Sequence, residues 1–283
     1  METKELRRGW TTGACATAAA VAAFELLIVG RSPVRVTITL PRGETPEFAI
    51  DRTAESLPPG QWAAAAVIKD AGDDPDVTHG ARIGVKVAWR ASHCDLPPGI
   101  EFRGGEGVGR VTRPGLALAV GEPAINPVPR AMIEQNLKAV AARLGVDCPL
   151  DLAVEVSVAD GERLALQTLN ERLGIVGGLS ILGTTGIVIP YSCSAWIHSI
   201  QRGVDVAVAS GATHLIAATG RTSELAAQNR FGVPDHALIE MGDFVGGFLK
   251  YLRQHPDNLL RLRRLTIAGG IGKMVKLAQG NLD

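Results

Sequence analysis

Four arginines lie close together in a segment of the first half that is rich in glycine and proline. The segment runs from Arg103 to Arg130 and also contains Arg110 and Arg113. A guanidinium group is planar and always charged, so an arginine on a stiff loop can bind a carboxylate or phosphate through two parallel hydrogen bonds. The segment therefore predicts a binding site for a substrate with several acidic groups. Surface arginines in weak ion pairs are an equally good interpretation.

A glycine-rich stretch at residues 174–186 is a second candidate for ligand binding. It contains five glycines in thirteen residues, together with the hydroxyls of Thr184 and Thr185. Glycine lets the backbone approach a bound molecule closely or adopt a positive φ, and hydroxyls add hydrogen-bonding groups. The spacing is not the GxGxxG of a dinucleotide-binding turn. A ligand-binding loop and a purely structural loop are both consistent with it.

A second glycine-rich turn, GGIGKM at residues 269–274, lies between an expected strand and the last expected helix. It resembles a phosphate-binding P-loop, but Ile267 stands where that motif needs its first glycine. Met274 replaces the Ser or Thr that binds magnesium. The free amide groups of such a turn can still bind an anion such as a carboxylate. The turn therefore predicts either an anion site or a tight structural turn.

The acidic residues do not indicate a metal site. Four aspartates and His79 fall between residues 70 and 79, but the EF-hand spacing is absent. Gly72 and Pro75 favour a solvated turn that ends a helix. The sequence contains no GxSxG nucleophile elbow, and its histidines stand singly. Neither metal chemistry nor a catalytic triad is predicted.

The second half alternates strands with helices. This order is typical of a mostly parallel sheet with helices on both faces, in which ligands bind beyond the carboxyl ends of the strands. The expected strands are residues 187–190, 214–220, 237–242 and 265–270. The expected helices are residues 192–210, 223–229, 244–253 and 271–278.

The first half mixes strands and helices without that alternation, which predicts an α+β domain. The apolar segment 14–29 is interrupted by Glu25 and consists largely of alanine, so we expect a buried helix after Thr11 rather than a membrane span or signal sequence. The expected strands are residues 34–40, 81–89 and 152–158. Two further helices are expected at residues 61–71 and 131–144.

The composition is that of an ordinary globular protein. The length of 283 residues suggests about two domains, which we place at residues 1–160 and 161–283. Lys plus Arg and Asp plus Glu each number 29, so the chain has no broad basic field to attract nucleic acid. The cysteines form no CxxC pair, which favours a reducing, cytoplasmic compartment. They are Cys15, Cys94, Cys148 and Cys193.

The sequence resembles one known family, the cobalt-precorrin-5B C-1-methyltransferases (CbiD) of anaerobic cobalamin biosynthesis. The resemblance runs in order across nearly the whole chain. The matching stretches are LRRGWTTGACATAAA from Leu6, VIKDAGDDPDVTHGA from Val67, GGEGVGRVTRPGL from Gly104, GEPAINPVPR from Gly121, NERLGIVGGLSILGTTGIVIPYSCSAWIHSI from Asn170, and GGIGKMVKLAQG from Gly269. Members of the family continue beyond the sequence that matches Gly280, so the resemblance implies a further segment after Asp283.

The resemblance implies methyl transfer from S-adenosylmethionine to C-1 of cobalt-precorrin-5B, a ring-contracted cobalt corrinoid, giving cobalt-precorrin-6A. Cobalt would enter only as part of the substrate, and no metal site in the protein is required. A polycarboxylate substrate suits the arginine segment, and a nucleoside cofactor with a carboxylate suits glycine-rich strand ends. We expect the N-terminal α+β domain to take the corrinoid and a C-terminal Rossmann-like domain to take the cofactor, on the two sides of a cleft.

The expected site residues follow from these two assignments. Glu106 is the candidate general base, because it lies in a glycine-rich loop between arginines, although a solvated carboxylate is the alternative. The residues expected to bind the cofactor are Gly177, Gly178, Thr184, Thr185, Gly186, Thr219, Gly220 and Gly242. Those expected to bind the substrate are Arg110, Arg113, Asn126 and Arg130.

Two other functions fit the same residues. One is a non-catalytic carrier of corrinoid intermediates, and the other is a nucleotide-dependent transferase that uses the turn at Gly269. Only the methyltransferase should bind S-adenosylmethionine or its demethylated product, whereas a nucleotide enzyme should prefer ATP with magnesium. Neither a nucleic-acid partner nor a membrane is expected, and the choice between a monomer and a homo-oligomer stays open.

Overall fold

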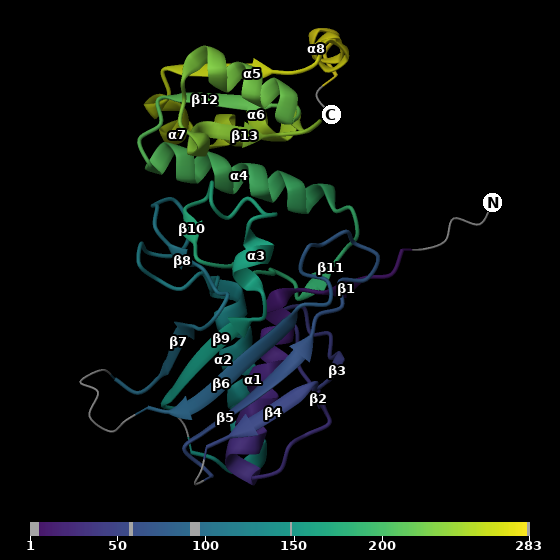
Figure 1. Cartoon of the computed structure of the whole chain (residues 1–283), viewed down its shortest axis with the longest axis vertical. Helices are drawn as coiled ribbons and strands as arrows, with labels where there is room; N and C mark the ends of the chain where they lie inside the picture. The colour runs from purple at the N-terminus through teal and green to yellow at the C-terminus, as the bar shows by residue number, and fades with distance from the viewer. Residues whose placement is uncertain (1–5, 57–58, 91–96, 148, 282–283) are drawn as a thin grey trace, which may run out of the picture. The chain divides into compact units, whose positions relative to one another are not determined.

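The computed structural model describes residues 6–56, 59–90, 97–147 and 149–281, and the chain divides into two compact units (Figure 1). Unit 1 comprises Met1–Arg110, Gly121–Asn170 and Ile175–Tyr191. Unit 2 comprises Val111–Val120, Glu171–Gly174 and Ser192–Asp283. The division therefore differs from the expected boundary at residue 160, because most of the stretch between 161 and 191 folds with unit 1.

Unit 1 is built on a mixed five-stranded sheet with the strand order β4-β5-β6-β9-β7. The strands are β4 (Arg52–Glu55), β5 (Trp62–Ile68), β6 (Arg82–Trp89), β7 (Ile100–Gly104) and β9 (Leu152–Val158). The first three neighbouring pairs in that order are antiparallel, and β7 runs parallel to β9. The alternating sequences of β6 and β9 predicted strands, and both are confirmed.

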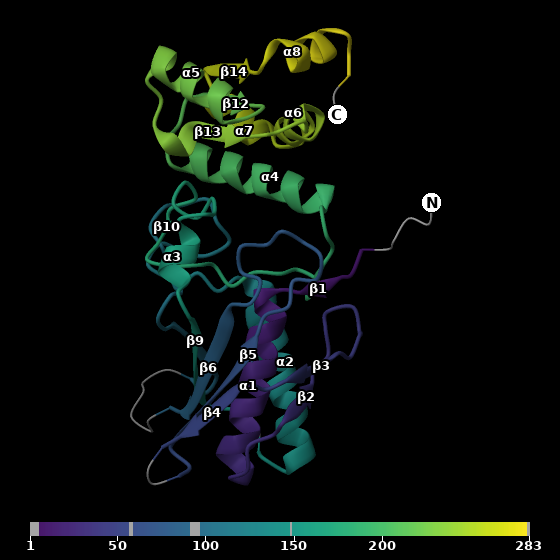
Figure 2. The ribbon, with the colours of Figure 1, turned by 45° about the vertical axis from the view of Figure 1, so that its right-hand side comes forward.

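Two long helices complete the core of unit 1. Helix α1 (Thr12–Val29) packs on β5 and β6, and α2 (Pro127–Leu144) packs against α1 (Figure 2). Although α1 is long and apolar enough to cross a membrane, 83% of it is buried inside the protein, which confirms the predicted buried helix. Helix α2 begins four residues before its predicted start, because proline fits the first turn, where no amide hydrogen is needed.

The prediction of a helix at residues 61–71 is wrong, because this segment forms strand β5. Alanine favours a helix by its intrinsic propensity. In the fold, β5 instead pairs with β4 on one side and β6 on the other. Its alanines Ala63 and Ala65 are buried in the same core cluster as the alanines of α1. Small side chains on both elements let the helix lie close to the sheet, and this packing outweighs the local preference.

Short strand pairs and one short helix make up the rest of unit 1. The residues predicted as the first parallel strand of the second half form β11 (Ile187–Val188), which instead pairs antiparallel with β1 (Gly9–Trp10). Strand β2 (Arg35–Thr37), shorter than predicted, pairs with β3 (Glu47–Ala49). Strand β8 (Arg110–Val111), whose second residue is the first of the unit 2 segment Val111–Val120, pairs with β10 (Ile175–Val176), and α3 is Gly161–Ala165.

Unit 2 contains a three-stranded parallel sheet with β12 in the centre, in the order β13-β12-β14. Each strand is followed by a helix, which confirms the predicted alternation for these strands. The strands are β12 (His214–Ala218), β13 (Leu238–Glu240) and β14 (Arg264–Ala268). The helices are α4 (Cys193–Ala209), α5 (Arg221–Phe231), α6 (Val245–Gln254), α7 (Pro256–Arg261) and α8 (Ile271–Ala278), with a 3-10 turn at Asp235–Ala237. Of these, α7 was not predicted.

Candidate functional site

A pocket lies at the carboxyl ends of the strands of unit 2, and we call it the strand-end pocket. Thr219 directly follows β12, Gly242 follows β13, and Ile267 belongs to β14. Its cavity volume is about 50 Å³, so it is a shallow pocket that opens widely to solvent. The central position of β12 makes this edge the expected ligand crevice of a parallel sheet. The other lining residues are Met241, Asp243, Val245, Lys273, Met274, Lys276, Leu277 and Asn281.

The lining of the strand-end pocket combines apolar side chains with two opposite charges. Lys273 Nζ forms an ion pair with the carboxylate of Asp243, and about half of each side chain is exposed. The hydroxyl of Thr219 adds a further hydrogen-bonding group. A ligand in this pocket could place an uncharged ring on the apolar wall and polar groups on the charged pair.

The structure brings two predicted cofactor residues, Thr219 and Gly242, to this pocket. A third, Gly220, is the N-cap residue of α5. The turn at residues 269–274 opens α8, with Gly270 as its N-cap residue. A Cβ added at Gly270 would meet nothing within 4 Å, whereas one at Gly269 would lie 3.0 Å from Thr219 Cγ2. The turn thus packs against the pocket through Gly269.

The other predicted cofactor residues belong to the stretch 174–186, which folds with unit 1 from residue 175 onward. Close packing and backbone conformation explain why glycine is needed at several positions of this stretch. Gly186 has a φ of 84°, and an added Cβ would lie 2.6 Å from Leu40 Cδ2. A Cβ at Gly178 would lie 2.3 Å from the carbonyl oxygen of Gly107. Substitution at these positions would therefore disturb folding and would not be a clean test of ligand binding.

The remaining predicted cofactor residues of that stretch differ in their contacts and exposure. Gly177 has a φ of 81°, and a Cβ there would meet nothing within 4 Å. The hydroxyl of Thr185 accepts a hydrogen bond from the N–H of Ile187 at 3.2 Å, so it stabilises its own turn. Thr184 is exposed. Close packing and positive φ account for much of the glycine content without a ligand.

The predicted substrate residues make separate local contacts in both units. Arg130 Nη2 lies 2.8 Å from Glu122 Oε2, and its Nε donates to the carbonyl of Ile125 at 2.7 Å. Arg110 donates to the carbonyl of Gly121. In unit 2, Arg113 Nη1 lies 2.8 Å from His236 Nδ1. Arg130 therefore stabilises the loop before α2.

Asn126 and Glu106, the remaining predicted site residues, both lie in unit 1. Asn126 is the N-cap residue of α2, but its side chain does not cap the helix, and its N–H donates to the carbonyl of Ile181 at 3.0 Å. Glu106 lies in the loop between β7 and β8 with an exposed side chain. Its carbonyl accepts a hydrogen bond from Val158 N–H at 2.9 Å, which ties the loop to β9.

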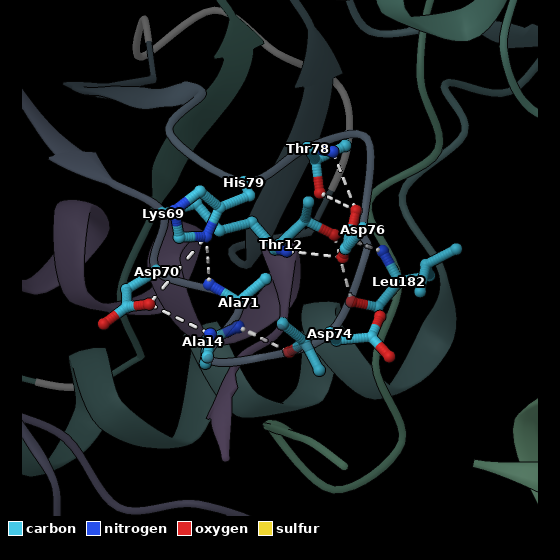
Figure 3. A network of polar contacts seen from close by, with 12 residues as sticks. Thr12, Ala14, Lys69, Asp70, Ala71, Asp74, Asp76, Thr78, His79 and Leu182 are labelled. Carbon is cyan, nitrogen blue, oxygen red and sulfur yellow. Dashed lines mark hydrogen bonds and ion pairs between the residues drawn. The ribbon is translucent and has the colours of Figure 1, made fainter. Parts of the chain in front are cut away.

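A buried ion pair that sequence reasoning missed lies in unit 1 (Figure 3). Lys69 directly follows β5, only 1% of its side chain is exposed, and its Nζ lies 2.6 Å from Asp76 Oδ2. The other oxygen of Asp76 accepts hydrogen bonds from the N–H and the hydroxyl of Thr78, at 2.7 and 2.6 Å. Burial opposes ionisation of Asp76, but Lys69 and Thr78 outweigh it, so the pKa of Asp76 is lowered.

The signal that could have found this pair is the alternation of side chains along β5. Val67 is 2% exposed, Ile68 is 43% exposed, and Lys69 returns to the buried side. A period of two places Lys69 on the same face as Val67. The expectation of a helix at 61–71 concealed this, because the helical period does not place those two residues together.

The loop between β5 and β6 also contacts the segment that precedes α1. Trp10 N–H donates to the carbonyl of Asp70 at 2.7 Å, and the guanidinium of Arg7 binds the carboxylate of Asp70. His79 Nδ1 accepts a hydrogen bond from Ala71 N–H at 3.1 Å. The loop connects two strands and does not end a helix as predicted. Within the described ranges, no group of three or more His, Cys, Asp or Glu residues could hold a metal ion.

The first turn of α1 has protein partners for its amide groups. Ala14 N–H donates to Thr11 Oγ1 at 3.1 Å, and Gly13 N–H donates to the carbonyl of Leu182 at 3.0 Å. Cys15 follows in the same turn, and burial raises the pKa of its thiol to about 12, so it is not a nucleophile. Cys193 is exposed, and Cys94 and Cys148 lie outside the described residues.

The ion pair between Arg7 and Asp70 predicts a dependence of stability on pH. The hydrogen bond from Arg7 holds the pKa of Asp70 at about 2, below its ordinary value of 3.8. The contribution of the pair is therefore complete above the ordinary pKa and is lost as the pH falls through the folded value. We expect the difference in unfolding free energy between the parent protein and Asp70→Asn, measured in urea, to shrink below about pH 4. A difference that stays constant down to the lowest pH at which both proteins fold would contradict this.

Comparison with known proteins identifies the family. The family model of CbiD matches residues 1–190. A cobalt-precorrin-5B C(1)-methyltransferase of Bradyrhizobium sp. is 58% identical over 280 residues, which are 99% of this chain and 71% of the relative. The enzyme of the same name from Methylorubrum extorquens is 57% identical over 282 residues, covering 100% of this chain and 74% of the relative.

A solved structure agrees with these sequence matches. The crystal structure of the cobalamin biosynthesis protein (cbiD) from Archaeoglobus fulgidus superimposes with a TM-score of 0.51 at 28% sequence identity. The match covers 98% of this chain and 81% of that one. Both chains therefore share a mixed α/β fold, and by sequence and by structure this chain belongs to the CbiD family.

Proposed function

We propose that this chain methylates C-1 of cobalt-precorrin-5B with S-adenosylmethionine as the methyl donor, giving cobalt-precorrin-6A in the cytoplasm. Relatives that are 57–58% identical over nearly the whole chain are named for this C(1)-methyltransferase activity. The observation that carries the cofactor assignment is the strand-end pocket, at the edge of a parallel sheet where nucleotide-like ligands bind.

We assign the two partners of the reaction to the two units. The parallel sheet and helices of unit 2 support a Rossmann-like domain for S-adenosylmethionine. The lining residues suit that cofactor, because an apolar wall fits the adenine and the charged pair fits its ribose and amino-acid groups. The α+β unit 1 would take the corrinoid, and cobalt would arrive as part of that substrate.

The proposed chemistry requires little beyond positioning of the two reactants. A ring carbon attacks the methyl group of the sulfonium, the C–C bond forms as the S–CH₃ bond breaks, and S-adenosylhomocysteine leaves. A proton then passes from the corrinoid to a base. Holding both reactants in line can contribute ~7–11 kcal/mol. Glu106 is the proposed base, since its carboxylate is exposed on a loop tied to β9.

Recognition of the corrinoid by unit 1 is proposed to depend on Arg110, with Asn126 as a further contact; the role of Arg113, which folds with unit 2, is proposed separately. Arg110 is exposed in unit 1 and uses a guanidinium N–H for the carbonyl of Gly121. Arg113 contacts the ring of His236, whose pKa is lowered by burial and by the charge of Arg113 itself. A neutral imidazole can accept the hydrogen bond from Arg113, so this contact does not remove the positive charge of the guanidinium. Arg130, which is bound to Glu122, would contribute to corrinoid recognition indirectly, by stabilising the loop before α2.

Replacement of Arg113 tests this assignment. Charge-assisted hydrogen bonds contribute ~1.5–3 kcal/mol each, so Arg113→Ala should raise the Kd for the corrinoid roughly ten- to a hundredfold. Arg113→Lys should recover part of the loss, because it retains the charge without the planar fork. Fluorescence titration with the corrinoid, and calorimetry with S-adenosylhomocysteine, separate the two ligands. Unchanged corrinoid affinity in folded Arg113→Ala would remove this arginine from the substrate site. Arg35→Ala, at an exposed ion pair in β2, is the control.

Ligand binding separates the proposed function from its two alternatives. The methyltransferase should bind S-adenosylhomocysteine in calorimetry, and a corrinoid carrier should bind the corrinoid alone. A nucleotide-dependent transferase should bind ATP with magnesium in preference to either. Binding of ATP with magnesium but not S-adenosylhomocysteine would overturn the proposal.

A further inference from the structure

The ion pair of the strand-end pocket joins two segments that each follow a strand. Asp243 lies three residues after the end of β13, and Lys273 lies in the first turn of α8, after β14. The exposed fraction is 55% for the side chain of Asp243 and 45% for that of Lys273. Because water reaches both groups, each can exchange its partner for a ligand at little cost in free energy.

The two groups select different ligand chemistry. A carboxylate only accepts hydrogen bonds, and its two oxygens can accept from both hydroxyls of a vicinal diol. An ammonium group only donates, and it pairs with a carboxylate. The apolar side chains of Met241, Ile267 and Leu277 complete the lining. A nucleoside with a ribose diol and a terminal carboxylate would supply a partner for each of these features.

The order of the strands indicates which residue would bind the ribose end of such a ligand and which would bind its carboxylate end. Strand β13 follows β12 in the chain and lies beside it in the sheet. In dinucleotide-binding sheets the acidic residue after the corresponding strand binds the ribose. Lys273 lies close to the amino end of α8, whose N-cap residue is Gly270. The amide groups of that end also favour an anion.

We propose that Asp243 accepts hydrogen bonds from the ribose hydroxyls of S-adenosylmethionine and that Lys273 binds its amino-acid carboxylate. The ligand then replaces the ion pair that joins the two side chains. This inference rests on the proposed function, because it takes S-adenosylmethionine as the ligand of the pocket. It adds to that function the residues that recognise each end of the cofactor.

A pair of ligands tests the two roles separately. S-adenosylhomocysteine carries both the diol and the carboxylate, whereas 5′-methylthioadenosine keeps the diol and lacks the carboxylate. Calorimetry should show that Lys273→Met weakens binding of S-adenosylhomocysteine about ten- to a hundredfold and leaves the affinity for 5′-methylthioadenosine unchanged or higher. Asp243→Asn should weaken binding of both ligands by a similar factor, about tenfold or more.

Two variants of α8 complete the design. Lys276→Met removes the same charge from another residue that lines the pocket, and it should leave the ratio of the two affinities unchanged. Lys273→Arg keeps the charge and should retain most of the preference for S-adenosylhomocysteine. Thermal unfolding of each variant checks that the fold is intact.

The possible outcomes distinguish the inference from the function on which it rests. If the parent protein binds neither ligand, the proposed cofactor is wrong and the inference fails with it. If the parent binds both and Lys273→Met weakens both equally, only the assignment of Lys273 is overturned. If Lys276→Met alone abolishes the preference for S-adenosylhomocysteine, Lys276 takes the role that we assign to Lys273. Equal affinities of Asp243→Asn and the parent would overturn the role of Asp243.

Discussion

Replacing Thr219 with tryptophan is expected to weaken binding of S-adenosylhomocysteine at least about a hundredfold, close to 2.7 kcal/mol. Thr219 lines the strand-end pocket directly after the central strand β12. An indole at this position would occupy space that the proposed cofactor needs. Calorimetry on the folded variant measures the effect, and circular dichroism checks that the protein has kept its secondary structure.

Ile271→Trp is the matched control for this experiment. Ile271 begins α8 in the same unit, its side chain is 86% exposed, and it is not among the residues that line the pocket. Its variant should bind S-adenosylhomocysteine like the parent protein. If Thr219→Trp folds and binds equally well, the cofactor does not use the strand-end pocket.

Asp76→Ala is expected to lower the free energy of unfolding by about 3–5 kcal/mol. The substitution leaves the ammonium group of Lys69, with 1% of its side chain exposed, without its carboxylate. An unpaired buried charge is far more costly than the loss of an exposed pair. Urea unfolding followed by circular dichroism measures the change.

Two further variants identify the cause of that loss. Glu47→Ala removes one partner of the exposed pair Arg35–Glu47, so it should change stability by no more than about 1 kcal/mol. Lys69→Met combined with Asp76→Ala removes the buried charge as well and should recover part of the stability. An Asp76→Ala variant that is as stable as Glu47→Ala would show that the buried pair contributes little.

Elements whose signal is local could be predicted from the sequence. The alternation in β6 and β9 and the helical patterns of α4 and α8 specify these elements within a few neighbouring residues. Strand β5 could not be predicted in this way, because its run of alanines favours a helix until α1 and two neighbouring strands are known. The same limit applies to β11, whose partner β1 lies far away in the sequence.

The candidate site was predictable where it follows from topology. Residues after parallel strands meet at one edge of the sheet, so Thr219 and Gly242 could be placed near each other at the edge that holds the strand-end pocket without coordinates. The contacts of single side chains could not be predicted. Composition gives no means of knowing that Arg130 binds Glu122, or that Gly178 is required by contact with Gly107. Such contacts depend on loops that only the complete fold brings together.

Transfer of an isotopically labelled methyl group tests the proposed function most directly. The protein is incubated with cobalt-precorrin-5B and S-adenosylmethionine that carries ¹³C in its methyl group, and the product is analysed by mass spectrometry and ¹³C NMR. We predict a product with one added labelled methyl group, bonded to C-1, together with an equal amount of S-adenosylhomocysteine. A corrinoid that binds but acquires no label, or that carries the label on another carbon, would contradict the assignment.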